Sequence, residues 1–145
     1  MLANLANAAV TTVPQYATVL GKNANCQTLV SLSLSNGHDS LPVACDLYLP
    51  ASWAHDRKRR LHAGVPPAVR FRTKPEIALE EIDRVRTAGV RFGCVLADAG
   101  YGLSAPFRQA LSERGLRWAV GIPARQKVYP IDVPAASIPA QRSAR

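Results

Sequence analysis

One carboxylate in the sequence stands where chemistry on a phosphate could take place. Asp98 directly follows the apolar run 92–97 and precedes Gly100, Tyr101 and Gly102. In α/β proteins, ligand groups gather outside the carboxyl ends of buried strands, and the pattern gives Asp98 this position. The two glycines allow a sharp turn that leaves room beside the acid for a metal ion and a phosphate. The alternative is that Asp98 bonds the amides of its own loop, as Asp commonly does.

A run of basic residues forms the second candidate group. Arg57, Lys58, Arg59 and Arg60 follow one another in the most charged part of the chain. Side chains of this kind could contact DNA phosphates, and neutralising several phosphates makes binding strongly dependent on salt. A solvated helical face explains the same run equally well. The run alone therefore leaves both interpretations open.

The overall charge favours a polyanionic partner. The chain has 145 residues, with 18 Lys and Arg against 10 Asp and Glu, and a net charge of +8. Such a balance concentrates polyanions at the surface, so nucleic acid is the leading partner class. Scattered positive charge on an ordinary soluble protein remains the alternative. The length leaves room for one modest domain.

Cysteine usage and hydropathy indicate a cytoplasmic protein. Cys26, Cys45 and Cys94 form no CxxC pair, and their odd count does not fit a disulfide framework. The three histidines show no zinc-binding spacing, and we expect them at the surface. No apolar run approaches the ~20 residues that a membrane span needs. We therefore expect reduced thiols, no membrane association and a cytoplasmic location.

Alternating apolar and polar residues predict an antiparallel hairpin. The first strand is expected over residues 26–35 and the second over residues 41–49, joined by a turn at Asn36 and Gly37. The apolar face of the second strand is expected to consist of Leu41, Val43, Cys45, Leu47 and Leu49.

Two helices are predicted to follow the hairpin. A short helix is expected over residues 52–63. Thr73 and Glu76 have capping-box spacing, which predicts the start of a longer helix that Gly89 ends. The apolar positions of this helix recur at helical spacing. Its water-facing residues are expected to be Glu80, Glu81, Arg84 and Arg86.

The remaining elements complete an α/β pattern. Residues 92–97 predict a strand covered on both faces by helices. Ser104 is expected to cap a helix that stops at Gly115, and residues 118–122 predict a further strand. The order is hairpin, helix, strand, helix, strand. Residues 1–13 are uninformative, and the proline-containing segment 124–145 is expected to lack fixed structure.

Several blocks of the sequence are similar to a known family. In order and spacing, they resemble the catalytic domain of bacterial insertion-sequence transposases of the DDE superfamily, over residues 14–123. The blocks are 15–17, 20–22, 25–27, 49–53 with Trp53, 63–66, 71–79 with Thr73, and 97–102 with Asp98.

The resemblance implies a fold and an activity. Family members have an RNase H-like fold, a mixed sheet with flanking helices, and cut and join DNA at transposon ends. Two Asp and one Glu hold two Mg²⁺ or Mn²⁺ ions, which must lie ~3.5–4 Å apart around one phosphate. Asp98 corresponds to the second Asp. Lys22, Arg72 and Lys74 lie in family-like blocks, which ranks them above the run 57–60 as contacts to the DNA backbone.

The sequence departs from the family pattern at the other two carboxylates. The first Asp should precede the block 15–27, yet residues 1–25 contain no Asp or Glu. The Glu should follow the strand 118–122, where only Asp132 is present. Glu113 matches no family position. We therefore expect a truncated catalytic domain, inactive by itself, in which loss of the first strand leaves an open sheet edge.

Three alternatives remain open at this point. The chain could be a non-catalytic DNA-binding or regulatory protein that associates with an intact transposase. A second chain could supply the missing carboxylates, in which case divalent ions would bind only to the mixed assembly. The third alternative is no function, with poor solubility because the sheet is incomplete.

Overall fold

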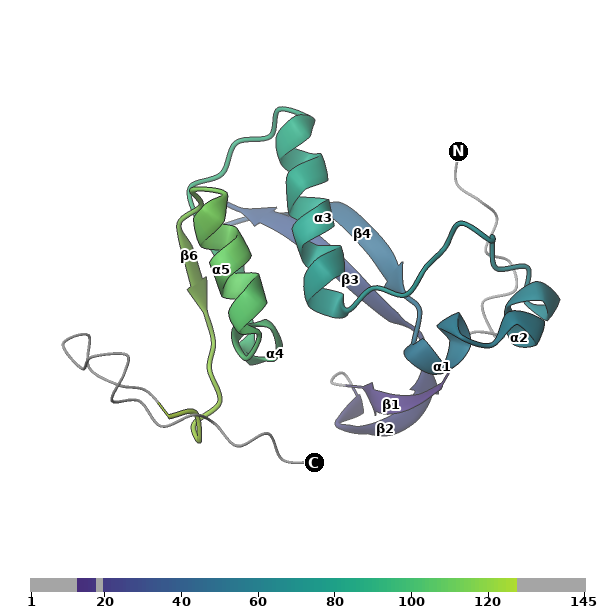
Figure 1. Ribbon diagram of the computed structural model, residues 1–145. Coiled ribbons are helices and arrows are strands. Elements are labelled where there is room, and N and C mark those ends of the chain that lie inside the picture. Colours follow the sequence, from purple (N-terminus) through teal and green to yellow (C-terminus); the bar gives the residue numbers. More distant parts are fainter. Residues whose placement is uncertain (1–12, 18–19, 128–145) are drawn as a thin grey trace, which may run out of the picture.

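The computed structural model describes residues 13–17 and 20–127, and it shows an α/β fold in which helices and short strands follow one another (Figure 1). Most of segment 1–13 and of segment 124–145 lies outside the described residues. The elements are β1 (Val13–Ala17), β2 (Lys22–Cys26), β3 (Thr28–Ser35), β4 (Ser40–Tyr48), α1 (Ala51–Ala54), α2 (Arg57–His62), α3 (Lys74–Thr87), β5 (Val95–Ala97), α4 (Ala99–Gly102), α5 (Ala105–Glu113) and β6 (Trp118–Val120).

The described strands pair into three two-stranded sheets. Strands β1 and β2 are antiparallel, as are β3 and β4, whereas β5 and β6 are parallel. The predicted order of hairpin, helix, strand, helix, strand is present from β3 to β6. The β1–β2 hairpin precedes it and was not predicted.

One hydrophobic core joins two of these sheets. It contains Val30 of β3, residues of α3 and α5, and partly buried side chains of β5 and β6. We call β3, β4, α3, β5, α4, α5 and β6 the body. We call β1, β2, α1 and α2 the arm, which lies to one side of the body in Figure 1. The deepest side chains of the core are Phe107, Ile77, Leu111 and Val30.

Helix α3 begins at the predicted capping box. The Thr73 side chain accepts a hydrogen bond from the Glu76 amide at 3.4 Å, and the Glu76 carboxylate accepts one from the Thr73 amide at 2.6 Å. Gly89 follows the helix with a φ of 85°, as a helix stop requires. The prediction for Glu81 was wrong, because this residue is buried and pairs with Arg84.

A β-bulge corrects the predicted face of β4. Leu32 pairs with Ala44 but Ser33 pairs with Pro42, so Val43 is an extra residue. One extra residue reverses the faces of every residue beyond it. Ala44 is therefore buried and Cys45 exposed, the opposite of the prediction.

The segment predicted as one helix over residues 52–63 forms two. Helix α1 ends at Ala54, and Asp56 begins α2 by accepting a hydrogen bond from the Arg59 amide at 2.9 Å. Asp is a strong helix N-cap, and this signal was overlooked in the sequence.

The strand predicted over 92–97 is shorter and less covered than expected. Strand β5 holds three residues, and Leu96 is 78% exposed on the face opposite the core. Within the described residues, helices therefore cover only one face of this strand. Ser104 caps α5 as predicted, and Gly115 ends it with a φ of 66°.

Candidate functional site

Asp98 lies at the carboxyl end of β5 and caps the helix that follows. Its Oδ1 atom accepts hydrogen bonds from the amides of Gly100 at 2.8 Å and Tyr101 at 3.3 Å. The side chain is exposed, and its Oδ2 atom has no hydrogen-bond partner among the described residues. The capping alternative is thus realised through one oxygen, and the carboxylate as a whole remains exposed.

Two glycines hold the loop of Asp98 against the end of β6. A Cβ atom on Gly102 would lie 1.8 Å from the carbonyl oxygen of Gly121. The Gly121 amide also donates a hydrogen bond to Ala97 at 2.9 Å. The sequence predicts a sharp turn at Gly102, but the structural role of this residue is the close approach to Gly121. Gly121 was overlooked, although a glycine directly after an apolar strand was a usable signal.

Tyr101 anchors the same loop to the core. Its ring packs against Phe107, with 5.5 Å between the ring centroids. Burial raises the pKa of the Tyr101 hydroxyl, and the nearby charge of Asp98 adds to the effect. The Tyr101 side chain, neutral and packed on the core, therefore anchors the loop that begins at Asp98.

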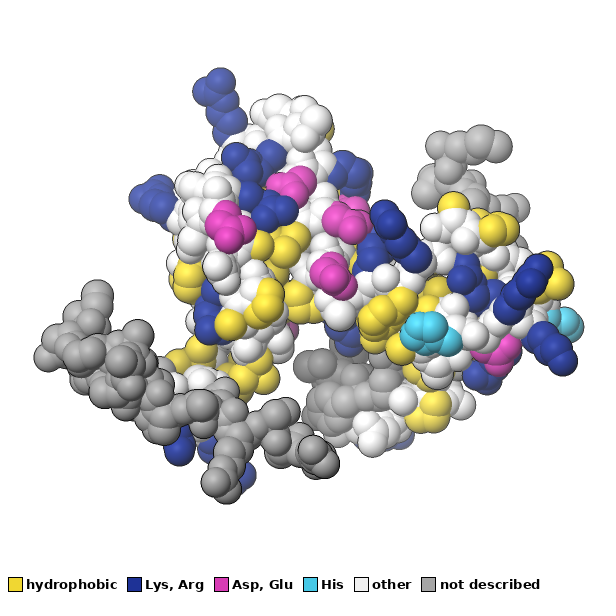
Figure 2. All heavy atoms as spheres, in the orientation of Figure 1, with side chains coloured by type: hydrophobic (Ala, Val, Ile, Leu, Met, Phe, Trp, Pro, Cys, Tyr) yellow, Lys and Arg dark blue, Asp and Glu magenta, His cyan; other side chains and the backbone are white. Residues whose placement is uncertain are grey.

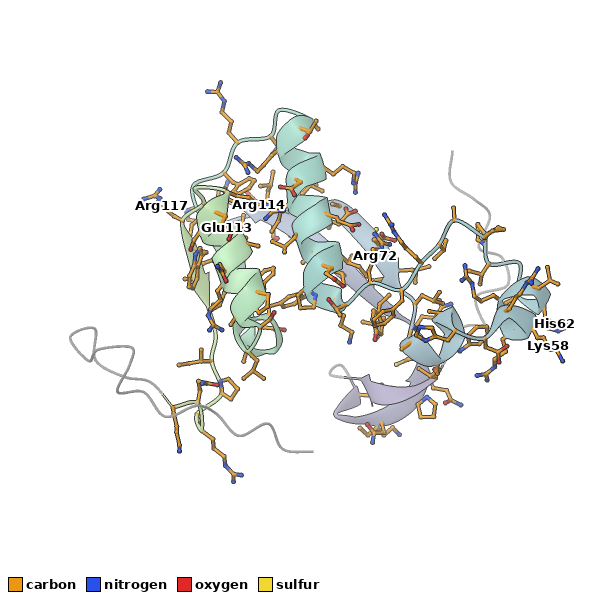
Figure 3. All side chains as sticks on the ribbon, viewed as in Figure 1. Lys58, His62, Arg72, Glu113, Arg114 and Arg117 are labelled. Atoms are coloured by element: carbon orange, nitrogen blue, oxygen red, sulfur yellow. The ribbon has the colours of Figure 1, made fainter. Side chains whose placement is uncertain are left out.

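The described residues do not by themselves fit a two-metal site. Within ranges 13–17 and 20–127 no group of three His, Cys, Asp or Glu residues is placed to hold a metal ion. Glu113 stands at the end of α5 away from α4 (Figure 3). One carboxylate cannot hold two divalent ions around a phosphate. No catalytic step is therefore assigned to these residues alone.

Arg72 and Lys74 are engaged with the body. Arg72 forms ion pairs with Asp46 at 2.7 Å and with Glu80 at 2.5 Å. Partial burial acts against its charged form, but the hydrogen bonds to these two carboxylates outweigh it and raise the pKa of Arg72. The Lys74 ammonium lies 5.2 Å from the centroid of the Tyr48 ring. The two acids around Arg72 reduce the charge that it can offer to a phosphate.

The basic run divides into two pairs. Arg59 stacks over the Trp53 ring at 4.7 Å, and Arg60 donates to the backbone carbonyl of Pro66 at 3.1 Å and to that of Val69. Arg57 and Lys58 are exposed and have no bonded partner among the described residues. The hydrogen bonds by which Arg60 holds the loop 66–69 could not be predicted from the sequence.

Among the described residues, Arg57 and Lys58 are the exposed, unengaged cations of the basic run on α2. Figure 3 shows Lys58 at the outer side of α2, away from the body. Figure 2 shows dark-blue side chains over this end of the molecule, whereas dark blue and magenta alternate over α3 and α5. Lys22 is also exposed, on β2. The roles of all seven predicted basic residues in DNA binding stay predictions.

Comparison with known proteins assigns the family. A family model described as DDE superfamily endonuclease matches residues 6–145. The chain belongs to this family. A probable transposase for insertion sequence element IS701 from Microchaete diplosiphon is 34% identical over 109 residues, which cover 74% of this chain and 26% of that protein. No solved structure matches the chain.

Membership of the DDE superfamily confirms the predicted resemblance, and the helices and strands of the structure confirm the predicted α/β fold class. The chain spans about a quarter of the length of the curated relative that it matches. The role of Asp98 as a family carboxylate stays a prediction. Among the described helices, none has the length and apolar character to cross a membrane.

Proposed function

We propose that this chain forms part of the catalytic domain of a DDE transposase, in which Asp98 is one of the carboxylates that bind Mg²⁺ or Mn²⁺ during DNA strand cleavage and transfer. The observation that carries the proposal is the position of Asp98. It combines a family match with the carboxyl end of a core strand, an exposed carboxylate and a loop held by two glycines.

The chain is inactive by itself under this proposal. A two-metal site needs carboxylates from several segments, and the described residues contain no group of three potential metal ligands. The proposed DNA substrate agrees with the net charge of +8 and with a cytoplasmic location.

The test is strand cleavage and joining by the purified chain on DNA carrying the element ends, with Mn²⁺ present. Asp98→Ala is the control variant. The expected result is no cleavage by either protein. Cleavage by the wild type and none by Asp98→Ala would show that the site is complete and that the proposal of an inactive chain is wrong.

A second candidate function is DNA binding without cleavage, as a remnant of a mobile element that associates with an intact transposase. The observation that favours it is the pair Arg57 and Lys58, which are exposed and unengaged among the described residues. Exposed cations bind phosphates without the cost of breaking internal ion pairs. The proposed backbone contacts are led by these two residues and Lys22, with Arg59, Arg60, Arg72 and Lys74 as partly engaged contributors.

Salt-dependent DNA binding tests this candidate. Arg57→Ala and Lys58→Ala should each lower the slope of log K against log salt by about 1 and weaken binding to any sequence. Arg86→Ala is the matched control, because Arg86 is an exposed arginine on α3 in the body. Equal effects of all three variants would show that the arm has no special role.

A further inference from the structure

Helix α2 exposes an apolar side chain among cations. Leu61 is 82% exposed, the largest fraction among the exposed large apolar side chains of the described residues. Residues three and four positions apart share a helix face, so Leu61 lies beside Arg57 and Lys58. At ~100° per residue, Leu61 points between the directions of these two cations around the helix axis. Figure 3 shows Lys58 and His62 on the outer side of α2, so this mixed face is turned away from the body.

The opposite face of α2 is fixed to the rest of the arm. The Arg59 guanidinium lies 4.7 Å from the centroid of the Trp53 ring. Arg60 donates hydrogen bonds to the carbonyl oxygen of Ala54 at 3.3 Å and to that of Pro66 at 3.1 Å. A helix that is held at several points presents its outer side chains in one direction. Binding through that face then loses little conformational entropy.

The charge of the arm favours an anionic partner. In segments 13–26 and 49–63 the sequence has Lys22 and the four cations of the run 57–60, against Asp56 as the one acid. The Asp56 carboxylate accepts a hydrogen bond from the Arg59 amide at 2.9 Å and caps α2. Within the described residues, Arg57 and Lys58 form no ion pair. The charge of these two side chains is therefore available to phosphates.

DNA suits this face better than a membrane surface does. Helices that lie on membranes bury a broad apolar face, whereas α2 has one apolar residue among its six. Proteins that kink DNA, in contrast, insert single apolar side chains such as leucine between base pairs from the minor groove. Basic residues on either side of the inserted side chain hold the phosphates. Leu61 with Arg57 and Lys58 has this arrangement.

We propose that the outer face of α2, formed by Arg57, Lys58 and Leu61, binds double-stranded DNA at the minor groove and that Leu61 inserts between two base pairs and kinks the duplex. The proposal rests on the second candidate function, DNA binding, and adds an apolar contact and a deformation of the duplex to it. It does not depend on metal binding by Asp98. Insertion favours flexible steps such as TA over stiff A-tracts, because they unstack more easily.

The probe is a duplex of about 30 base pairs with one central TA step, in which 2-aminopurine replaces the adenine of that step. A pair of fluorophores at the two ends reports the bend by energy transfer, and 2-aminopurine becomes brighter when it is unstacked. Binding of the full chain should increase both signals. A duplex with a central A-tract should bind about tenfold more weakly than the TA duplex.

Substitutions at Leu61 separate insertion from phosphate contact. Leu61→Ala should abolish both signals and weaken binding to the TA duplex about tenfold, to the level of the A-tract duplex. The slope of log K against log salt should not change, because no phosphate contact is lost. Leu61→Met keeps a long apolar side chain and should retain both signals. Leu41→Ala is the matched control, since Leu41 is 65% exposed on β4 in the body, and it should change none of these quantities.

Four outcomes would overturn the proposal. If Leu61→Ala keeps both signals while salt-dependent binding persists, the chain binds DNA without insertion, and the second candidate function stands. If replacement of thymine by uracil weakens binding as much as Leu61→Ala does, Leu61 contacts thymine methyl groups in the major groove instead. If Leu61→Ala abolishes binding to vesicles of phosphatidylcholine and phosphatidylserine but not to DNA, the face is a membrane surface. If the chain binds no DNA, the proposal and the second candidate function fail together.

Discussion

The body and the arm differ in what holds their residues in place. In the body, Phe107, Ile77 and Leu111 are almost completely buried and belong to one continuous core. In the described part of the arm, the buried side chain is Trp53, and Arg59 stacks over its ring. Burial of apolar side chains thus stabilises the body. In the arm, Arg57 and Lys58 are exposed and form no internal ion pair among the described residues. Asp98 belongs to the body and the basic run to the arm.

Substitution of one leucine in the body and one in the arm should give the largest difference in the free energy of unfolding. Leu111→Ala removes a fully buried side chain and should lower the free energy of unfolding by about 2–5 kcal/mol. Leu61→Ala in α2 should change it by less than about 0.5 kcal/mol, because Leu61 is 82% exposed. Urea titration measures both. Equal losses would show that the arm is part of the core.

The capping box of α3 gives a smaller effect. Thr73→Ala should cost about 1 kcal/mol at neutral pH, since it leaves the Glu76 amide without its partner. Thr87→Ala, at the exposed end of the same helix, is the matched control and should cost less. Thermal unfolding compares the two variants. A larger loss for Thr87→Ala would contradict the capping role.

The same box predicts a pH dependence. Hydrogen bonds from the backbone and side chain of Thr73 lower the pKa of Glu76. A carboxyl group whose pKa is lower in the folded state stabilises the fold above its unfolded pKa, near 4.5, and loses this contribution as the pH falls through the folded pKa. Glu76→Gln removes the titrating carboxyl group and should therefore flatten the decline in stability below pH 4.5. An unchanged decline would assign it to other carboxylates.

The ion pair between α3 and α5 gives the smallest effect on stability. Asp83 contacts Arg114 at 2.7 Å, and this hydrogen bond lowers the pKa of Asp83 although partial burial opposes it. Both side chains are partly exposed, so Asp83→Asn should cost less than about 1 kcal/mol, and less still in high salt. Asp39→Asn, at the tip of the β3–β4 hairpin, is the control. A salt-independent loss would contradict an electrostatic origin.

The sequence predicted the body where local and long-range preferences agree. Thr73, Glu76 and Gly89 mark helix ends by chemistry that acts within a few residues, and the structure has them in those roles. Asp98 was placed by the strand that it follows. Such features need no knowledge of the rest of the fold.

Other features depended on partners that are distant in sequence. Glu81 is at an apolar position of α3, and its burial follows from packing rather than from its own preference. Leu96 was expected under a helix, but coverage of a face is decided by other elements. Arg60 donates hydrogen bonds to backbone carbonyls up to nine residues away, and no rule of sequence spacing predicts such bonds.

The bulge at Val43 has a consequence for changes in chain length. Deletion of Val43 would remove the bulge and leave the other partners in place, because Ala44 would still lie opposite Leu32 and Cys45 opposite Ser31. The loss of this one codon would thus keep the methyl group of Ala44 buried and the thiol of Cys45 exposed. The bulge gives the hairpin room to lose one residue without moving its surface.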